Sequence, residues 1–128
     1  MLLDTTVLVE IFRSPGTSSL FRKIVEEMGD EEAFVSIIQL GEIADWAVRN
    51  GIPAKDRVDS VKEIALIVPL SQKICLDAAE IKYRRRESGY KDFGLLDGIV
   101  LATARSVKQK ILTFDTDFEG ETDCRVIS

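Results

Sequence analysis

The sequence predicts an α/β protein, a three-layer α/β/α sandwich around a central parallel sheet of four to five strands. Short apolar segments alternate with segments of helical periodicity along all 128 residues. The strand segments are continuous apolar runs, which is typical of strands that helices cover on both faces. No apolar run is long enough to span a membrane, and glycine and proline are sparse, so we expect one domain over residues 1–128.

The predicted strands are short apolar runs that end at polar or turn residues. The first ends near Asp4, the third ends at Pro69, and the fourth runs into a turn at 115–118. The five runs cover residues 1–4, 33–36, 67–70, 110–114 and 124–127.

The predicted helices lie between these strands and carry recognisable start and stop signals. Asp4 or a following threonine can cap the first helix, and Pro53 opens the fourth. Gly29, Gly51 and Gly89 end three of the others. The helical segments cover residues 7–11, 18–28, 38–50, 53–65, 72–88 and 95–107.

The composition excludes several kinds of active site. The chain has no histidine, so serine–histidine and cysteine–histidine nucleophile pairs are absent, and a hydrolase would depend on carboxylates and a metal. Cys75 and Cys124 lack zinc-binding spacing, and we expect both to be buried thiols. The N-terminus lacks a secretory signal, so we expect a cytoplasmic protein. The net charge of −5 opposes general affinity for polyanions.

Acidic residues follow two of the predicted strands. Asp4 follows the first strand, and Asp115 and Asp117 follow the fourth. In parallel sheets, ligands bind at the carboxyl ends of the strands, so we expect these acids to lie near one another. Asp97 begins an apolar helix, where a charge is costly unless it is paired, solvated in a cleft or bound to a metal.

Each of these acids also has a purely structural interpretation. Asp4 can cap a helix, Asp97 can complement a helix dipole, and the two aspartates after the fourth strand suit a turn. Glu42 is the weakest candidate from periodicity. A helical wheel places it nearly opposite the apolar face of residues 38–50, so it is predicted to face solvent.

Metal-dependent phosphodiester cleavage gives a reason to group these acids. Mg²⁺ and similar hard cations take oxygen ligands and keep several waters, and such an ion can activate water and clamp a phosphate. Clustered acids repel one another, by about 1 kcal/mol per pair at 4 Å in water and about 4 kcal/mol at a dielectric of 20. A bound cation would relieve that repulsion.

Four segments, in this order, resemble the motifs of the PIN-domain family. They are LLDTTVL at 2–8, VS at 35–36 followed by LGEI at 40–43, LDGIVLATA at 96–104, and LTFDTDF at 112–118. The resemblance implies a PIN-like fold and a nuclease that uses Mg²⁺ or Mn²⁺. It assigns the catalytic acids to Asp4, Glu42, Asp97 and Asp115, with Asp117 as a fifth, and metal binding to Asp4, Asp97 and Asp115. Supporting positions are Thr6, Ser36 and Thr113.

Two departures from the family pattern stand out. Thr6 replaces the usual asparagine, and Gly98, Val100 and Leu101 match the third motif loosely. Neither departure removes an acid. The chain length is similar to that of the VapC-type toxin ribonucleases, which implies an RNA substrate, a small antitoxin partner and a homodimer.

A basic patch precedes Asp97. It consists of Arg84, Arg85, Arg86 and Lys91. Arginine binds phosphate with two nitrogens at once, so one or two of the three arginines are expected to reach RNA or an acidic partner. The alternative is a solvated helix end whose cations complement the carbonyl dipole.

Three other functions compete with a toxin endoribonuclease. One is a non-catalytic scaffold of the same fold that binds RNA or protein, and a second is an RNA-processing nuclease that is not a toxin. The third is an aspartyl-phosphate enzyme with Asp4 as nucleophile. Such enzymes carry a second aspartate where this chain has Thr6, which argues against that alternative.

Overall fold

The computed structural model describes residues 1–128 and contains five strands, six α-helices and one short 3-10 helix. The strands are β1 (Leu2–Leu3), β2 (Phe34–Ser36), β3 (Leu66–Val68), β4 (Ile111–Thr113) and β5 (Cys124–Val126). The helices are α1 (Thr5–Arg13), α2 (Ser19–Met28), α3 (Ile37–Arg49), α4 (Ala54–Ile64), α5 (Gln72–Glu87), α6 (Leu95–Ser106) and the 3-10 helix η1 (Thr116–Phe118).

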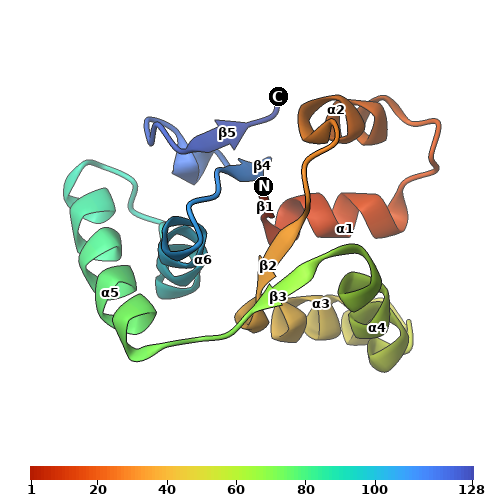
Figure 1. Ribbon diagram of the computed structural model, residues 1–128, viewed down its shortest axis with the longest axis horizontal. Helices are drawn as coiled ribbons and strands as arrows, with labels where there is room; N and C mark the ends of the chain where they lie inside the picture. Colours follow the sequence, from red (N-terminus) through yellow and green to blue (C-terminus); the bar gives the residue numbers. More distant parts are fainter.

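All five strands pair in parallel in the order β3-β2-β1-β4-β5 (Figure 1). The central strand β1 pairs with β2 on one side and with β4 on the other, and Leu2 faces Phe34 and Ile111 across these two pairings. The chain builds the sheet outward from β1 to β3 and then returns to add β4 on the opposite side. This reversal creates a switch point at the carboxyl ends of β1 and β4, the place where open parallel sheets bind ligands.

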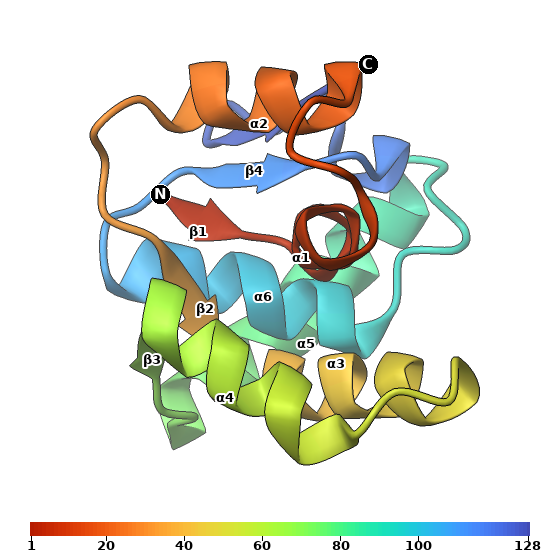
Figure 2. The same cartoon turned by 90° about the vertical axis from the view of Figure 1, so that its right-hand side faces the viewer.

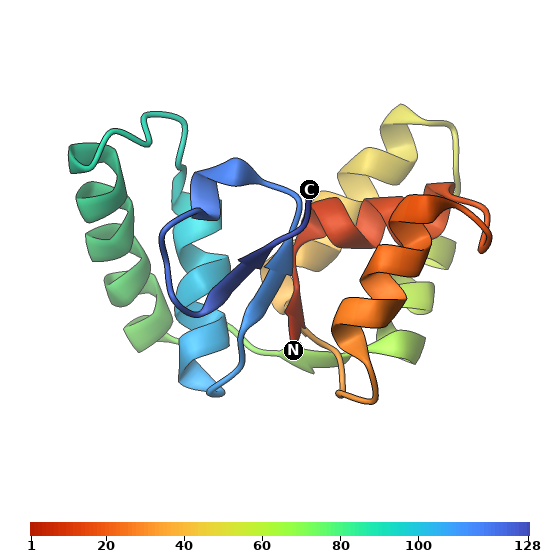
Figure 3. The same ribbon diagram turned by 90° about the horizontal axis from the view of Figure 1, so that it is seen from above.

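Helices cover both faces of the sheet, which confirms the predicted three-layer sandwich. Helices α5 and α6 lie on one side and α1 and α2 on the other (Figure 3). Leu2 and Ile111 belong to the core under α5 and α6, whereas Leu3 and Leu112 belong to the core shared with α1 to α4. Successive strand residues therefore point to opposite faces, and both faces are apolar.

Local signals explain where the helices begin. The hydroxyls of Ser18 and Ser71 accept hydrogen bonds from backbone N–H groups in the first turns of α2 and α5, each at 3.1 Å. Helix α4 begins directly after Pro53. All predicted helices and strands are present, and their ends agree within a few residues.

Helices α5 and α6 pack in close contact because of Gly98. A Cβ atom on Gly98 would lie 2.5 Å from the carbonyl oxygen of Ala78 on α5. The loose match of the third motif at this position therefore has a packing reason. The contact also sets the position of Asp97, the neighbouring residue at the start of α6.

The expectation of two buried thiols is wrong for Cys75, which is exposed on α5. Cys124 is half-buried on β5, and burial raises the pKa of its thiol to about 12. None of the helices has the length and apolar character that crossing a membrane requires.

Candidate active site

An open cleft of about 590 Å³ lies at the carboxyl ends of β1 and β4. Figure 2 shows that α1 follows directly from the carboxyl end of β1, at the same edge of the sheet as the cleft. The cleft is lined by Asp4, Thr5, Thr6, Val9, Glu10, Arg13, Leu20, Glu42, Asp97, Phe114 and Asp115. Four of the five predicted acids are among these residues, so segments more than 100 residues apart contribute to one site.

Asp4 is the most deeply buried acid of the cleft, with 6% of its surface exposed. It stands at the N-cap position of α1, but its side chain makes no capping hydrogen bond. Instead Oδ2 accepts hydrogen bonds from the Thr6 and Thr113 hydroxyls at 2.8 and 2.7 Å. Burial raises the pKa of Asp4, and these two hydroxyls oppose the shift. The helix-cap interpretation of Asp4 therefore does not hold.

Thr6 and Thr113 connect α1 to β4 around this carboxylate. The Thr6 hydroxyl also accepts the Phe114 N–H at 3.1 Å, and the Thr113 hydroxyl accepts the Asp115 N–H at 2.9 Å. Each threonine thus donates to Asp4 and accepts from the backbone that follows β4. The Thr6 hydroxyl therefore orients the Asp4 carboxylate.

Glu42 faces the cleft, so the helical-wheel prediction that it faces solvent is wrong. The Thr5 hydroxyl donates to Glu42 Oε1 at 2.7 Å. Helix α3 contacts α1, α4 and α6, so protein covers more than one of its faces and a single apolar stripe does not describe it. Burial raises the pKa of Glu42, and the nearby Asp4 carboxylate adds to this shift. The hydrogen bond from Thr5 opposes the shift without cancelling it.

Ser36 and Gln39 hold α3 in the position that presents Glu42. The Ser36 hydroxyl accepts the Ile38 N–H at 3.3 Å, and Gln39 Oε1 accepts the Ser36 N–H at 2.8 Å. The Gln39 amide then donates to the Leu3 carbonyl at 2.6 Å. Ser36 is fully buried and caps the helix, so its support is structural.

Asp97 combines its structural role with a place in the cleft. Its Oδ2 accepts the Gly94 N–H at 2.8 Å, which stabilises the start of α6. Burial raises the pKa of Asp97 to about 6, and repulsion from the carboxylates of Asp115, Asp4 and Glu42 adds to this shift. The hydrogen bond from Gly94 acts in the opposite direction and lowers the pKa. The four carboxylates are therefore close enough to influence one another's charge.

The two aspartates after β4 have different surroundings. Asp115 lines the cleft, and its Oδ1 accepts the Asp117 N–H at 2.8 Å, so it also serves the turn. Asp117 is not among the residues that line the cleft. Partial desolvation and the neighbouring Asp115 and Asp92 raise the pKa of Asp117.

Two charged residues of the cleft, Glu10 and Arg13, were not predicted from the sequence. Arg13 Nε donates to Glu10 Oε2 at 3.0 Å, and Glu10 also accepts from the Ser14 hydroxyl. A signal was present in the sequence. Residues 6, 10 and 13 lie on one face of helix α1. Because Thr6 faces the site, Glu10 and Arg13 are expected to lie on the same side of the helix as the site.

The predicted basic patch divides into buried and exposed members. Arg85 is buried, with its guanidinium 3.7 Å from the Tyr90 ring centre and bonded to the carbonyls of Asp117 and Glu119. It therefore joins α5 to the segment around η1 and does not present its charge at the surface.

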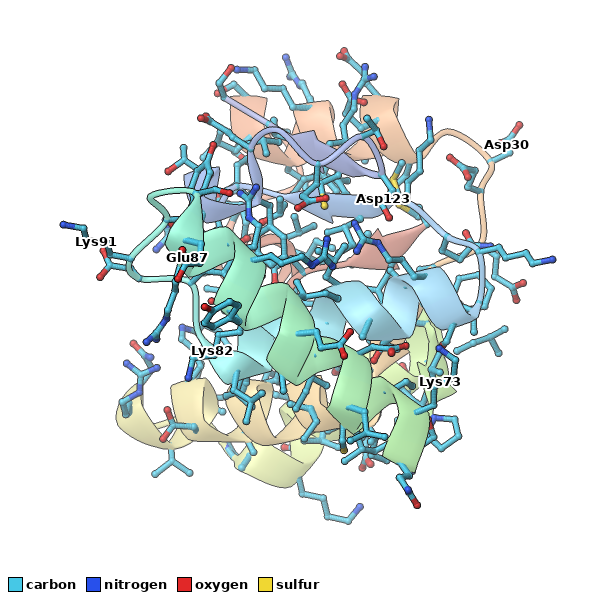
Figure 4. The ribbon with its side chains drawn as sticks, turned by 90° about the vertical axis from the view of Figure 1, so that its left-hand side faces the viewer. Asp30, Lys73, Lys82, Glu87, Lys91 and Asp123 are labelled. Carbon is cyan, nitrogen blue, oxygen red and sulfur yellow. The ribbon has the colours of Figure 1, made fainter.

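The other members of the patch, Arg84, Arg86 and Lys91, are exposed. Figure 4 shows Lys91 at the margin of the molecule, beyond Glu87 of α5. Arg86 Nε donates to the Phe93 carbonyl at 2.8 Å. None of the three lines the acidic cleft.

Solved structures share this fold over nearly the whole chain. A toxin–antitoxin complex from Klebsiella pneumoniae aligns with a TM-score of 0.76 at 22% identity and covers 98% of this chain and 95% of that one. VapBC2 from Rickettsia felis, bound to a promoter DNA fragment, aligns at 0.73 and 16% identity over 98% and 96%. FitAcB from Neisseria gonorrhoeae aligns at 0.69 and 20% identity over 99% and 96%.

Sequence comparison supplies the family assignment. No curated protein sequence matches the chain. The sequence profile of the PIN domain family matches residues 1–120, which include all four acids of the cleft. The order of the motifs, the parallel sheet and the family profile agree, and the chain belongs to the PIN domain family.

Proposed function

We propose that this protein is an endoribonuclease that depends on Mg²⁺ or Mn²⁺ and cleaves RNA phosphodiester bonds. The observation that carries the proposal is the convergence of Asp4, Glu42, Asp97 and Asp115 on one cleft at the sheet's switch point. Membership of the PIN domain family supports a nuclease.

The donor set of the cleft fits a hard divalent cation. It offers carboxylate oxygens and contains neither cysteine nor histidine, which suits Mg²⁺ or Mn²⁺ rather than zinc. No three acidic or cysteine side chains converge closely enough to ligate one ion together. Mg²⁺ is compatible with this arrangement, because it commonly takes one or two carboxylates directly and fills its remaining positions with water. Of Asp4, Asp97 and Asp115, one or two would bind the ion directly and the remainder would bind it through its water ligands.

The roles of the residues follow from their environments. When bound, the cation would supply Lewis acidity at the scissile phosphate and make an attacking water more acidic. Thr6 and Thr113 hold the Asp4 carboxylate in one orientation, and Thr5 does the same for Glu42. The cleft is open to solvent rather than enclosed, which is compatible with a polymeric substrate.

We further propose that the protein is the toxin of a toxin–antitoxin pair and forms a homodimer. The toxin role is supported by fold similarity over nearly the whole chain to chains of a toxin–antitoxin complex, of VapBC2 and of FitAcB. The homodimer follows from the family resemblance. The toxin role requires a short open reading frame immediately upstream of the gene, and co-expression with its product should yield a complex without nuclease activity. Light scattering of the free protein should give twice the mass of one 14.3 kDa chain. Monomer mass or absence of a complex would contradict this part.

Cleavage assays test the enzymatic proposal directly. Purified protein should cut single-stranded or structured RNA with Mn²⁺ or Mg²⁺, and a chelator or Asp97→Asn should abolish cutting. Asp56→Asn provides a matched control, since Asp56 also lies in a first helical turn but on α4, outside the cleft. Cleavage by Asp97→Asn at the wild-type rate would refute the assignment. Tight RNA binding without cleavage would instead support a non-catalytic scaffold.

A further inference from the structure

Arg13 is the only cation among the residues that line the acidic cleft. The other charged lining residues are Asp4, Glu10, Glu42, Asp97 and Asp115. A polyanion entering such a cleft meets repulsion from every charged group except this one. We propose that Arg13 forms a phosphate-binding subsite, which holds a backbone phosphate of the nucleic acid beside the carboxylates. This inference rests on the proposed nuclease function and adds a residue outside the acidic set.

The Arg13 guanidinium is held in place by one edge. Its Nε donates to Glu10 Oε2 at 3.0 Å, and the Glu10 side chain is only 10% exposed. The Ser14 hydroxyl fixes the other Glu10 oxygen, Oε1. A nearly buried, doubly bonded carboxylate is a rigid anchor, so it limits the rotamers that Arg13 adopts.

The opposite edge of the guanidinium remains available. Neither terminal nitrogen of Arg13 makes a hydrogen bond within the protein, and its side chain is 63% exposed. These nitrogens form the planar fork that binds two phosphate oxygens at once. Because only Nε contacts Glu10, the ion pair orients the guanidinium and leaves both terminal nitrogens free to bind a phosphate.

The other arginines near the site do not combine a place in this cleft with a buried anchor. Arg85 is buried against Tyr90, and Arg84 and Arg86 lie outside the cleft lining. Arg49 lines a neighbouring pocket that also includes Glu42, and its Nε donates to Asp45 at 3.1 Å. The Asp45 side chain, however, is 70% exposed and is a less rigid anchor than Glu10. Arg13 shares the helix face of Thr6, which bonds directly to Asp4. A phosphate held by Arg13 would therefore lie in the same cleft as the carboxylates.

Salt dependence of RNA binding distinguishes a phosphate contact from a structural ion pair. The assay uses a fluorescent single-stranded oligoribonucleotide, Mg²⁺ and protein carrying Asp97→Asn, so that cleavage does not interfere. Adding Arg13→Gln should weaken binding roughly tenfold at low salt. It should also reduce the slope of log K against log salt by about 0.7, the value for one phosphate on a single strand. Arg13→Lys should keep the slope.

Arg125 supplies a matched control. Its Nε contacts Glu27 at 2.7 Å and its side chain is 62% exposed, but it lies outside the cleft. Arg125→Gln should leave both affinity and slope unchanged. With Asp97 restored, Arg13→Gln should raise KM for RNA and largely preserve kcat, and its Tm should match that of Arg125→Gln within about 2 °C.

The outcomes separate the two proposals. If the parent protein binds RNA and Arg13→Gln keeps its full salt slope and affinity, the subsite is refuted and the nuclease proposal stands. If Arg13→Gln and Arg125→Gln reduce the slope equally, the effect is general charge, and the subsite is again refuted. If the parent protein neither binds nor, with Asp97 restored, cleaves RNA, both proposals fail together.

Discussion

Thr113 on β4 donates a 2.7 Å hydrogen bond to Asp4 at the end of β1, across a separation of 109 residues. Both residues are buried, and the same Asp4 oxygen accepts a second hydroxyl from Thr6. Burial alone would favour the neutral acid, and the two donors favour the carboxylate. The pairing of β1 with β4 therefore positions this acid and supplies one of the two hydroxyl donors that favour its ionised form.

Thr113→Val should destabilise the fold and impair the site. The change leaves a buried carboxylate with one donor fewer, so the free energy of unfolding should fall by about 1–3 kcal/mol. The pKa of Asp4 should rise, which moves the acidic limb of the activity profile to higher pH. Urea unfolding and a pH–rate profile measure the two effects.

Thr103 is a suitable control for that experiment. It is also fully buried, and its hydroxyl donates to the Ile99 carbonyl of its own helix at 2.6 Å. Thr103→Val should leave the pH–rate profile unchanged. Identical profiles for the two variants would show that the Thr113 hydroxyl does not act on Asp4.

Asp97 should make stability depend on pH. Burial raises its folded-state pKa from 3.8 to about 6, so the folded protein binds this proton more tightly than the unfolded chain. The contribution of Asp97 to the free energy of unfolding therefore falls as the pH rises from about 4 to 6. Above that window Asp97→Asn should be more stable than wild type by about 1 kcal/mol, allowing for partial exposure.

Thermal melts at pH 4 and pH 8 test the sign of this effect. The Tm advantage of Asp97→Asn should be about 3–5 °C at pH 8 and should disappear near pH 4. Asp56→Asn on α4 should show no such pH-dependent advantage. A wild-type protein that is more stable than Asp97→Asn at pH 8 without metal would contradict the argument.

Mn²⁺ should stabilise the wild-type protein, because a ligand bound only by the native state shifts the folding equilibrium. At about 100 times its dissociation constant the gain is on the order of 2–3 kcal/mol. Asp4→Asn and Asp97→Asn should lose most of this gain, and a chelator should reverse it. Calorimetric melts with and without millimolar Mn²⁺ provide the measurement, and an unchanged wild-type Tm would contradict a metal site.

Gly98→Ala should destabilise the protein by about 1–3 kcal/mol. The added methyl group would overlap the Ala78 carbonyl on α5, and backbone cannot yield as a flexible side chain does. Gly41→Ala on α3 is the matched control, since nothing lies within 4 Å of its added Cβ and alanine favours helix. Chemical denaturation should give opposite signs for the two variants, and equal effects would refute the packing argument.

Arg85→Ala should cost about 3–5 kcal/mol, because it removes a buried cation and leaves the Asp117 and Glu119 carbonyls without their donor. The adjacent Arg84→Ala should change stability by about 0.5 kcal/mol or less, since Arg84 is exposed. Urea titrations compare the two variants. Similar stabilities would show that the Arg85 contacts contribute little.

The fold was predictable because its signals are local. Each strand is a short apolar run, and helix starts carry serine or proline at the expected places. The acids Asp4 and Asp115 were predictable by one further rule, since parallel strands bring their carboxyl ends to one edge. Glu42 came from the family resemblance alone, and the helical wheel opposed it.

By itself the sequence determined the order of strands and helices, the layer architecture and the acids that follow β1 and β4. Only the tertiary structure decided that Glu42 turns inward, that Arg85 is buried while Arg84 is exposed, and that Arg13 enters the cleft. Backbone hydrogen bonding and apolar periodicity depend on residues that are close in the sequence, so the secondary structure can be predicted from the sequence. The environment of a charged side chain depends on neighbours brought from distant segments, and the Thr113 hydroxyl on Asp4 is one of them.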